Sequence, residues 1–148
     1  MQKIFRLIVV VLIFNMLLSS ASSKEIPEMR VCLTQDATSV SYRIQSGCYE
    51  LRDIATNWSV GTLRPGDIVT INLEGSNLNV EVNGEQDNIP FSGPLVALPQ
   101  DKSDKNVFSF KNTQYRDGLT VSIDNRRLLA VNHVGIENYL YGVVGREM

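Results

Sequence analysis

Short segments in which apolar and polar residues alternate constrain the fold of this chain more than any other feature. Ser39–Ile44, Ile68–Leu73 and Leu78–Val82 each place an apolar residue at every second position. A period of two puts alternate side chains on opposite faces of a β-strand, so one face of each segment is suited to a core. The pattern predicts a domain built mainly from half-buried strands.

Turn-forming residues separate these segments and set the number of strands. Arg64-Pro65-Gly66-Asp67 predicts a tight turn, and Asn83-Gly84 is typical of a hairpin. Residues 89–111 hold three prolines and a charged stretch, which predicts looser chain with a solvated loop at 101–105 before the strand pattern resumes at Val107. The strands are expected at Met29–Leu33, Ser39–Ile44, a strand edge within Gly47–Ile54, Ile68–Leu73, Leu78–Val82, Val107–Phe110, Leu119–Ile123 and Leu128–Val131.

The apolar period changes near the end of the chain. Ile136, Tyr139, Leu140, Val143 and Val144 are spaced as on one face of an α-helix. We therefore predict an α+β fold, a β-rich single domain with a C-terminal helix. A helix that covers a sheet is usually followed by more core, so we expect an incomplete fragment of a larger domain.

The N-terminus has the three parts of a secretory signal. Met1–Arg6 is basic, Leu7–Leu18 is apolar, and Ser19–Ser23 is a run of small residues suited to signal peptidase. Cleavage after Ala21 gives a signal peptide of residues 1–21, and cleavage after Ser23 is the alternative. The apolar run is short for a membrane span, so we expect a membrane attachment only if the segment stays uncleaved. The mature chain is then secreted, in the cell wall or on the outer face of the cytoplasmic membrane.

Charge and cysteine content narrow the function classes. Removal of Lys3 and Arg6 from 14 basic residues leaves 12 against 16 acidic ones, and this acidic balance argues against nucleic acid as a partner. Two cysteines and one histidine make no convincing four-ligand zinc site, so we expect no metal and no cofactor. Outside the cytoplasm, Cys32 and Cys48 either pair as a disulfide or remain free.

A dense motif occupies Tyr115–Met148, the last part of the predicted domain 29–148. Its residues are Tyr115-Arg116, Val131-Asn132, Glu137, Tyr139-Leu140, Gly142-Val143-Val144 and Glu147-Met148. In these residues the chain resembles the stage II sporulation protein D and amidase enhancer family. It departs from the family pattern at an inserted Asp117, at Asn138 in place of an acid, and at Gly145-Arg146.

The resemblance implies a peptidoglycan lytic transglycosylase that cleaves denuded glycan strands in sporulation or wall remodelling. Glu147 matches the family's catalytic acid. Cleavage of a glycosidic bond needs a proton on the leaving oxygen, so the acid has to be protonated near neutral pH. An apolar surrounding raises the pKa of such a carboxyl. A lytic enzyme manages with one carboxyl because the C6 hydroxyl of muramic acid attacks C1.

Other residues have a functional and a structural interpretation. Tyr141 is the candidate for stacking on a sugar ring, and Arg146 for meeting the lactyl carboxylate. Glu137 is better explained as an acid at the positive end of the helix dipole, and Tyr139 as part of the core. Trp58 is interpreted as half-buried packing, with a glycan platform as the alternative.

The resemblance also supports a function without catalysis. The amidase enhancer members of the family suggest a cell-wall binding module or an activator of a cell-wall amidase. The two hypotheses differ in the role of Glu147, which only the enzyme requires. For these 148 residues alone we expect no activity, since part of any substrate cleft would be missing.

Overall fold

The computed structural model describes residues 27–101 and 105–147, and within them side chains up to residue 142. The predicted signal peptide, residues 1–21, lies outside the described residues. The described part contains strands and one helix, α2 (Ile136–Glu147). The strands are β1 (Glu28–Ala37), β2 (Ser39–Ser46), β3 (Tyr49–Asp53), β4 (Trp58–Leu63), β5 (Ile68–Glu74), β6 (Asn77–Val82), β7 (Glu85–Gln86), β8 (Leu95–Pro99), β9 (Val107–Phe110), β10 (Thr113–Arg116), β11 (Gly118–Asp124) and β12 (Arg127–Gly135).

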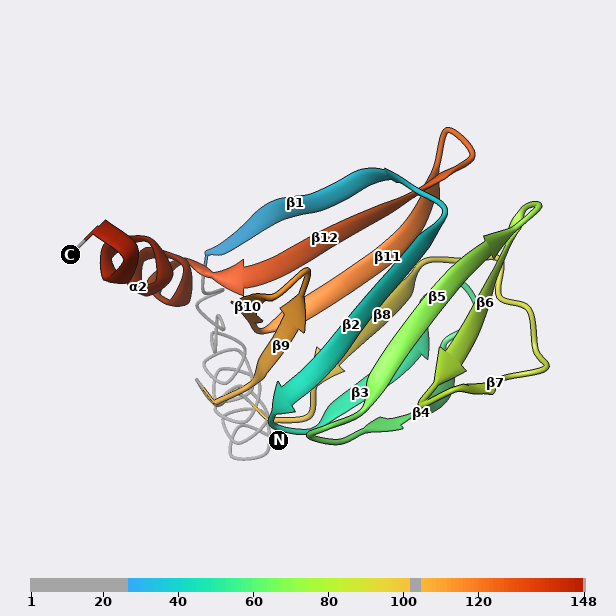
Figure 1. Cartoon of the computed structure of the whole chain (residues 1–148), viewed down its shortest axis with the longest axis horizontal. Coiled ribbons are helices and arrows are strands. Elements are labelled where there is room, and N and C mark those ends of the chain that lie inside the picture. Colours follow the sequence, from blue (N-terminus) through green and yellow to red (C-terminus); the bar gives the residue numbers. More distant parts are fainter. Residues whose placement is uncertain (1–26, 102–104, 148) are drawn as a thin grey trace, which may run out of the picture.

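The strands form two six-stranded sheets. In the first sheet the order is β1-β12-β11-β8-β3-β4, and in the second it is β10-β9-β2-β5-β6-β7. All pairings between neighbouring strands are antiparallel. The chain passes from the first sheet to the second at Thr38, between the end of β1 and the start of β2 (Figure 1). The predicted β-rich domain with a C-terminal helix is confirmed.

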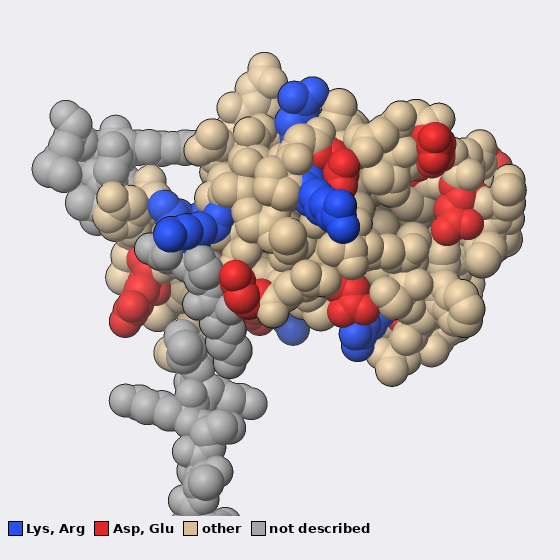
Figure 2. Space-filling view, turned by 90° about the horizontal axis from the view of Figure 1, so that it is seen from below, with Lys and Arg blue, Asp and Glu red and all other residues tan. Residues whose placement is uncertain are grey.

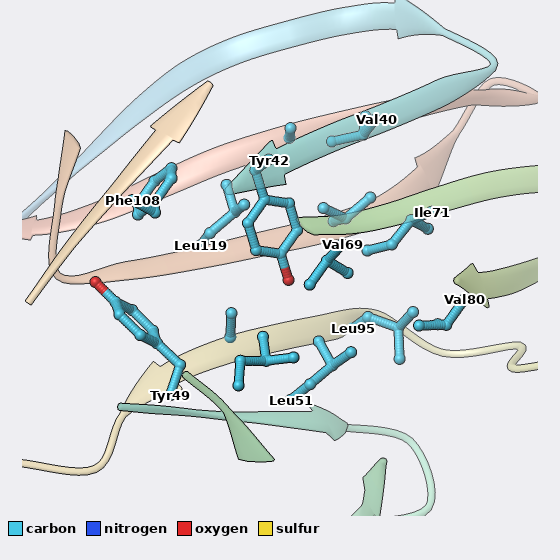
Figure 3. Close-up of a cluster of buried hydrophobic side chains, with 14 of the residues drawn as sticks. Val40, Tyr42, Tyr49, Leu51, Val69, Ile71, Val80, Leu95, Phe108 and Leu119 are labelled. Atoms are coloured by element: carbon cyan, nitrogen blue, oxygen red, sulfur yellow. The ribbon is translucent and has the colours of Figure 1, made fainter. Parts of the chain in front are cut away.

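One hydrophobic core lies between the inner faces of the two sheets. Val40, Tyr42 and Val69 enter it from the second sheet, and Leu51 and Leu119 enter it from the first (Figure 3). Along β2 the pattern is strict, because every second residue from Val40 to Ile44 is buried and those between are exposed. The period of two in the sequence therefore corresponds to the burial in the structure.

The predicted turns are also confirmed. The Asp67 amide donates to the Arg64 carbonyl over 3.0 Å, and Gly66 at the tip has a φ of +100°. Asn83 and Gly84 both have positive φ, at 55° and 87°, as a two-residue hairpin with a type I′ turn requires. The first turn connects β4 to β5, and the second connects β6 to β7 and sets their register.

The strand expected within Gly47–Ile54 is present as β3. It does not form an edge of the first sheet, because it lies between β8 and β4, and β4, which was not predicted, forms that edge. β8 and β10 were not predicted either. The Trp58 side chain in β4 is 57 % exposed, so the expected half-buried packing is wrong.

The helix α2 projects from one end of the sandwich instead of lying flat on a sheet (Figure 1). Leu140 is 52 % exposed, and Tyr139, expected in the core, is only half-buried. Within the described residues no helix is both long and apolar enough to span a membrane. Cys32 and Cys48 are both exposed free thiols, so the structure favours the unpaired alternative.

The charged residues are scattered over the surface that Figure 2 shows. Basic and acidic side chains both lie on that face, and uncharged residues cover most of it. The sequence as a whole has a net charge of −2. A group of basic side chains without acidic neighbours would therefore be unusual on a protein with this charge.

Candidate functional site

The start of α2 is held by hydrogen bonds from two distant parts of the chain. The Gly135 amide donates to Asp117 Oδ2 over 2.9 Å, and the Ile136 amide donates to the Pro27 carbonyl over 3.1 Å. The first N–H groups of a helix have no partner within the helix. Asp117 supplies an acceptor, and its negative charge stands at the positive end of the helix dipole. Glu137 lies in the same first turn.

Asp117 forms a one-residue link between β10 and β11. Its φ is +64°, a left-handed conformation that aspartate tolerates better than most residues. Its carboxylate also accepts from the Asn138 side chain, with distances of 3.2 Å to Oδ1 and 3.1 Å to Oδ2. The inserted aspartate thus binds both the residue before α2 and a residue within its first turn.

A buried asparagine of β12, Asn132, binds the backbone on both sides of this link. The Asn132 side chain, 2 % exposed, donates to the Arg116 carbonyl over 2.7 Å and to the Gly118 carbonyl over 2.8 Å. These two carbonyls flank Asp117. Because buried polar groups without partners are costly, the two hydrogen bonds favour this one path of the chain. Asn132 is one of the residues that carry the family resemblance.

Further polar groups surround the link from inside the sandwich. The Asp117 amide donates to the carbonyl of the buried Asn106 over 3.2 Å. Burial raises the pKa of Tyr49, and the negative charges of Asp117 and Asp101 raise it further. The Tyr49 hydroxyl therefore stays protonated. This end of the core is polar, whereas the rest of the core cluster is apolar.

Arg116 and Tyr141 meet on the outside of this junction. The Arg116 guanidinium carbon lies 5.5 Å from the centre of the Tyr141 ring, a cation–π distance. Tyr141 is still 72 % exposed, so most of the ring remains accessible. Tyr141 was expected as a sugar contact, whereas no role was predicted for Arg116, although Arg116 belongs to the motif.

Arg146 and Glu147 lie in the last turn of α2, at the end that points away from the sandwich. Their side chains lie outside the described part of the structure. The backbone therefore places both residues on the same helix as Tyr141, and the geometry of the carboxyl group of Glu147 stays a prediction.

The single histidine makes local contacts. His133 Nε2 lies 2.9 Å from the Thr120 hydroxyl, and Nδ1 lies 3.4 Å from a carboxylate oxygen of Glu28. Among the residues that the structure describes, no three His, Cys, Asp or Glu side chains are grouped as metal ligands would be. His133 thus links β12 to its two neighbours, β11 and β1.

The comparisons with known proteins give no relative. No family model, no curated protein and no solved structure matches this chain. The candidate site therefore stands on its own residues: the β10–β11 link, Asn132 beneath it, and α2 with Tyr141.

Removal of the Asp117 carboxylate is expected to destabilise the chain and loosen α2. We expect Asp117→Ala to lower the free energy of unfolding by about 1–2 kcal/mol, because it removes a helix-capping acceptor and places alanine at positive φ. Urea unfolding followed by circular dichroism measures the change. Asp124→Ala, at the exposed far end of β11, is the matched control. Equal losses in both variants would show that Asp117 does not act through α2.

Proposed function

We propose that this protein is an exported cell-wall protein of the sporulation protein D type. In full length it cleaves denuded peptidoglycan strands as a lytic transglycosylase, in sporulation or in wall remodelling. Glu147 is the general acid. The proposal includes a domain larger than these 148 residues, an idea that the exposed Leu140 on the apolar face of α2 supports.

One observation carries the proposal. Motif residues that are far apart in the sequence belong to one connected unit at the start of α2. Asn132 binds the carbonyl of Arg116, and Arg116 contacts the ring of Tyr141 on α2. A helix whose start and orientation are fixed in this way offers a rigid support for residues in its last turn. The resemblance places the catalytic acid in that turn.

The proposed reaction needs one carboxyl group. The Glu147 carboxyl gives its proton to the leaving oxygen while the bond between C1 and that oxygen breaks. The C6 hydroxyl of the same muramic acid forms a new bond to C1 and returns its proton to the carboxylate. Atoms and charge balance without water, and the product ends in a 1,6-anhydro ring.

Two further residues have proposed roles in binding. The exposed ring of Tyr141 stacks on a sugar, which a 72 % exposed aromatic side chain allows. Arg146 meets the lactyl carboxylate of muramic acid as a charged hydrogen-bond donor. Both roles use the outer part of α2, next to the acid.

The second candidate is a cell-wall binding module or amidase activator without chemistry. The exposed rings of Trp58 and Tyr141 favour it, because aromatic rings on a protein surface are suited to sugar binding. In that case peptidoglycan strands and a cell-wall amidase are partners of the protein, and no bond is cleaved.

The products formed by the native protein distinguish the candidates. We expect that the protein isolated from its producing cells, after its intact mass is measured, releases fragments with anhydro ends from denuded glycan strands. Mass spectrometry separates these ends from reducing ends, which carry one more water. Reducing ends would identify a hydrolase and contradict the lytic mechanism. Strands that bind and stay intact would support the binding module.

A further inference from the structure

The outer face of the second sheet carries a shallow hollow of about 390 Å³. It lies over β2, β9 and the start of β5, and it is separate from α2. Its lining is hydrophilic, with hydroxyl, amide and cationic side chains: Ser41, Arg43, Gln45, Ser109, Lys111 and Asn112. None of the described residues that line it is acidic.

Two cations line this hollow, Arg43 and Lys111. Arg43 of β2 is paired with Ser109 of β9. Lys111 lies in the turn that follows β9, with a φ of +48° and its ammonium group 5.2 Å from the centre of the Phe110 ring. Arg43 and Lys111 are both exposed. Because both side chains line the same hollow, an anion bound there would be attracted by two positive charges.

The acid that directly precedes β5 does not neutralise this pair. Asp67 accepts from the Arg64 amide over 2.7 Å and from the Asn83 side chain over 2.8 Å. The hydrogen bond from Asn83, followed by that from the Arg64 backbone, lowers the pKa of Asp67. Its carboxylate is thus committed to the two turns beside the start of β5. Among the described residues, neither Arg43 nor Lys111 forms an ion pair.

The side chains that line the hollow are suited to a ligand with a carboxylate and several hydroxyl groups. A guanidinium group binds a planar carboxylate through two parallel hydrogen bonds, and an ammonium group adds a second charge. The hydroxyls of Ser41 and Ser109 and the side-chain amide of Asn112 suit the hydroxyls of a sugar. Ile68, 37 % exposed at the rim, offers an apolar contact for the C–H face of the ring.

We propose that the hollow over β2 and β9 binds a carboxylate-bearing sugar of an acidic polysaccharide, held by Arg43 and Lys111. The ligand gains from a local positive charge on a chain whose net charge is −2. No residue of α2 takes part. This site and the proposed cleavage by Glu147 therefore succeed or fail independently.

Calorimetric titration with a galacturonic acid oligosaccharide tests the site. We expect binding that Arg43→Gln and Lys111→Gln each weaken by about tenfold, since each removes one charge-assisted contact. Arg127→Gln, which removes an exposed arginine from β12 in the other sheet, is the matched control and should leave the affinity unchanged. An uncharged oligosaccharide of the same length should not bind.

Each outcome decides the proposal. If Arg127→Gln lowers the affinity for the oligosaccharide as much as the other two substitutions do, the ligand responds only to the total charge of the protein, and the proposal is overturned. If inorganic phosphate competes as strongly as the oligosaccharide, the hollow is a simple oxyanion site and the assignment to a sugar is wrong. Absence of binding also overturns the proposal. Selective weakening by Arg43→Gln and Lys111→Gln, without competition by phosphate, supports it.

Discussion

Glu147→Gln is expected to lower the rate of glycan cleavage by the native protein by about 10²–10⁴-fold, the usual contribution of a general acid. Glutamine keeps the size and polarity of the side chain but has no proton to give to the leaving oxygen. The loss should appear in kcat, because the proton is needed in the transition state and little in substrate binding. Release of anhydro-ended fragments from denuded strands measures it.

Glu137→Gln is the matched control for this experiment. It makes the same substitution on the same helix, in the first turn instead of the last. We expect it to leave the cleavage rate within about twofold of the wild-type rate, because the charge of Glu137 acts on the helix dipole. If both variants keep full activity, the enzyme hypothesis fails and the binding module remains. If both lose it equally, the effect belongs to the helix and not to the acid.

The alternation of apolar residues was sufficient to predict much of this fold. β2, β5 and β6 lie where the period of two placed them, because each has one face in the core and one in solvent. Turn chemistry set their ends, as at Asn83-Gly84. These features depend only on neighbouring residues, so the position of each of these strands can be predicted from its own segment of the sequence.

The missed strands lack that local signal. β8 (Leu95–Pro99) begins with three consecutive buried residues, since Val96 on its other face is also only 6 % exposed. A continuous apolar run with proline at either end resembles a loop as much as a strand. β4 and β10 are short and largely polar on the outside. Their partners, and not their own residues, make them strands.

The candidate site also depends on contacts that have no local signal in the sequence. The motif located α2 and Tyr141, but the function of Asp117 depends on Gly135, a residue 18 positions away. From the sequence Asp117 was only an insertion between Arg116 and Gly118. Its role follows from the pairing of β11 with β12, which brings the link beside the start of the helix. Contacts of this kind are set by sheet register and not by spacing along the chain.

Phe108→Ala is expected to give the largest loss of stability, about 3–5 kcal/mol in the free energy of unfolding. Phe108 is 1 % exposed and lies between two rings. The Tyr115 ring stacks on it at 5.6 Å between centres, and the Tyr42 ring meets it edge to face at 6.1 Å. Alanine would remove these contacts and leave a cavity in the core.

This cavity would lie directly beside the candidate site. Tyr115 belongs to β10, whose next residue, Arg116, contacts Tyr141 on α2. Urea unfolding measures the loss, and Trp58→Ala is the control, since this larger ring is 57 % exposed on the edge strand β4. We expect less than about 1 kcal/mol for the control, because little apolar surface leaves the core. A loss of similar size in both variants would contradict the prediction that the buried Phe108 ring stabilises the sandwich more than the exposed Trp58 ring does.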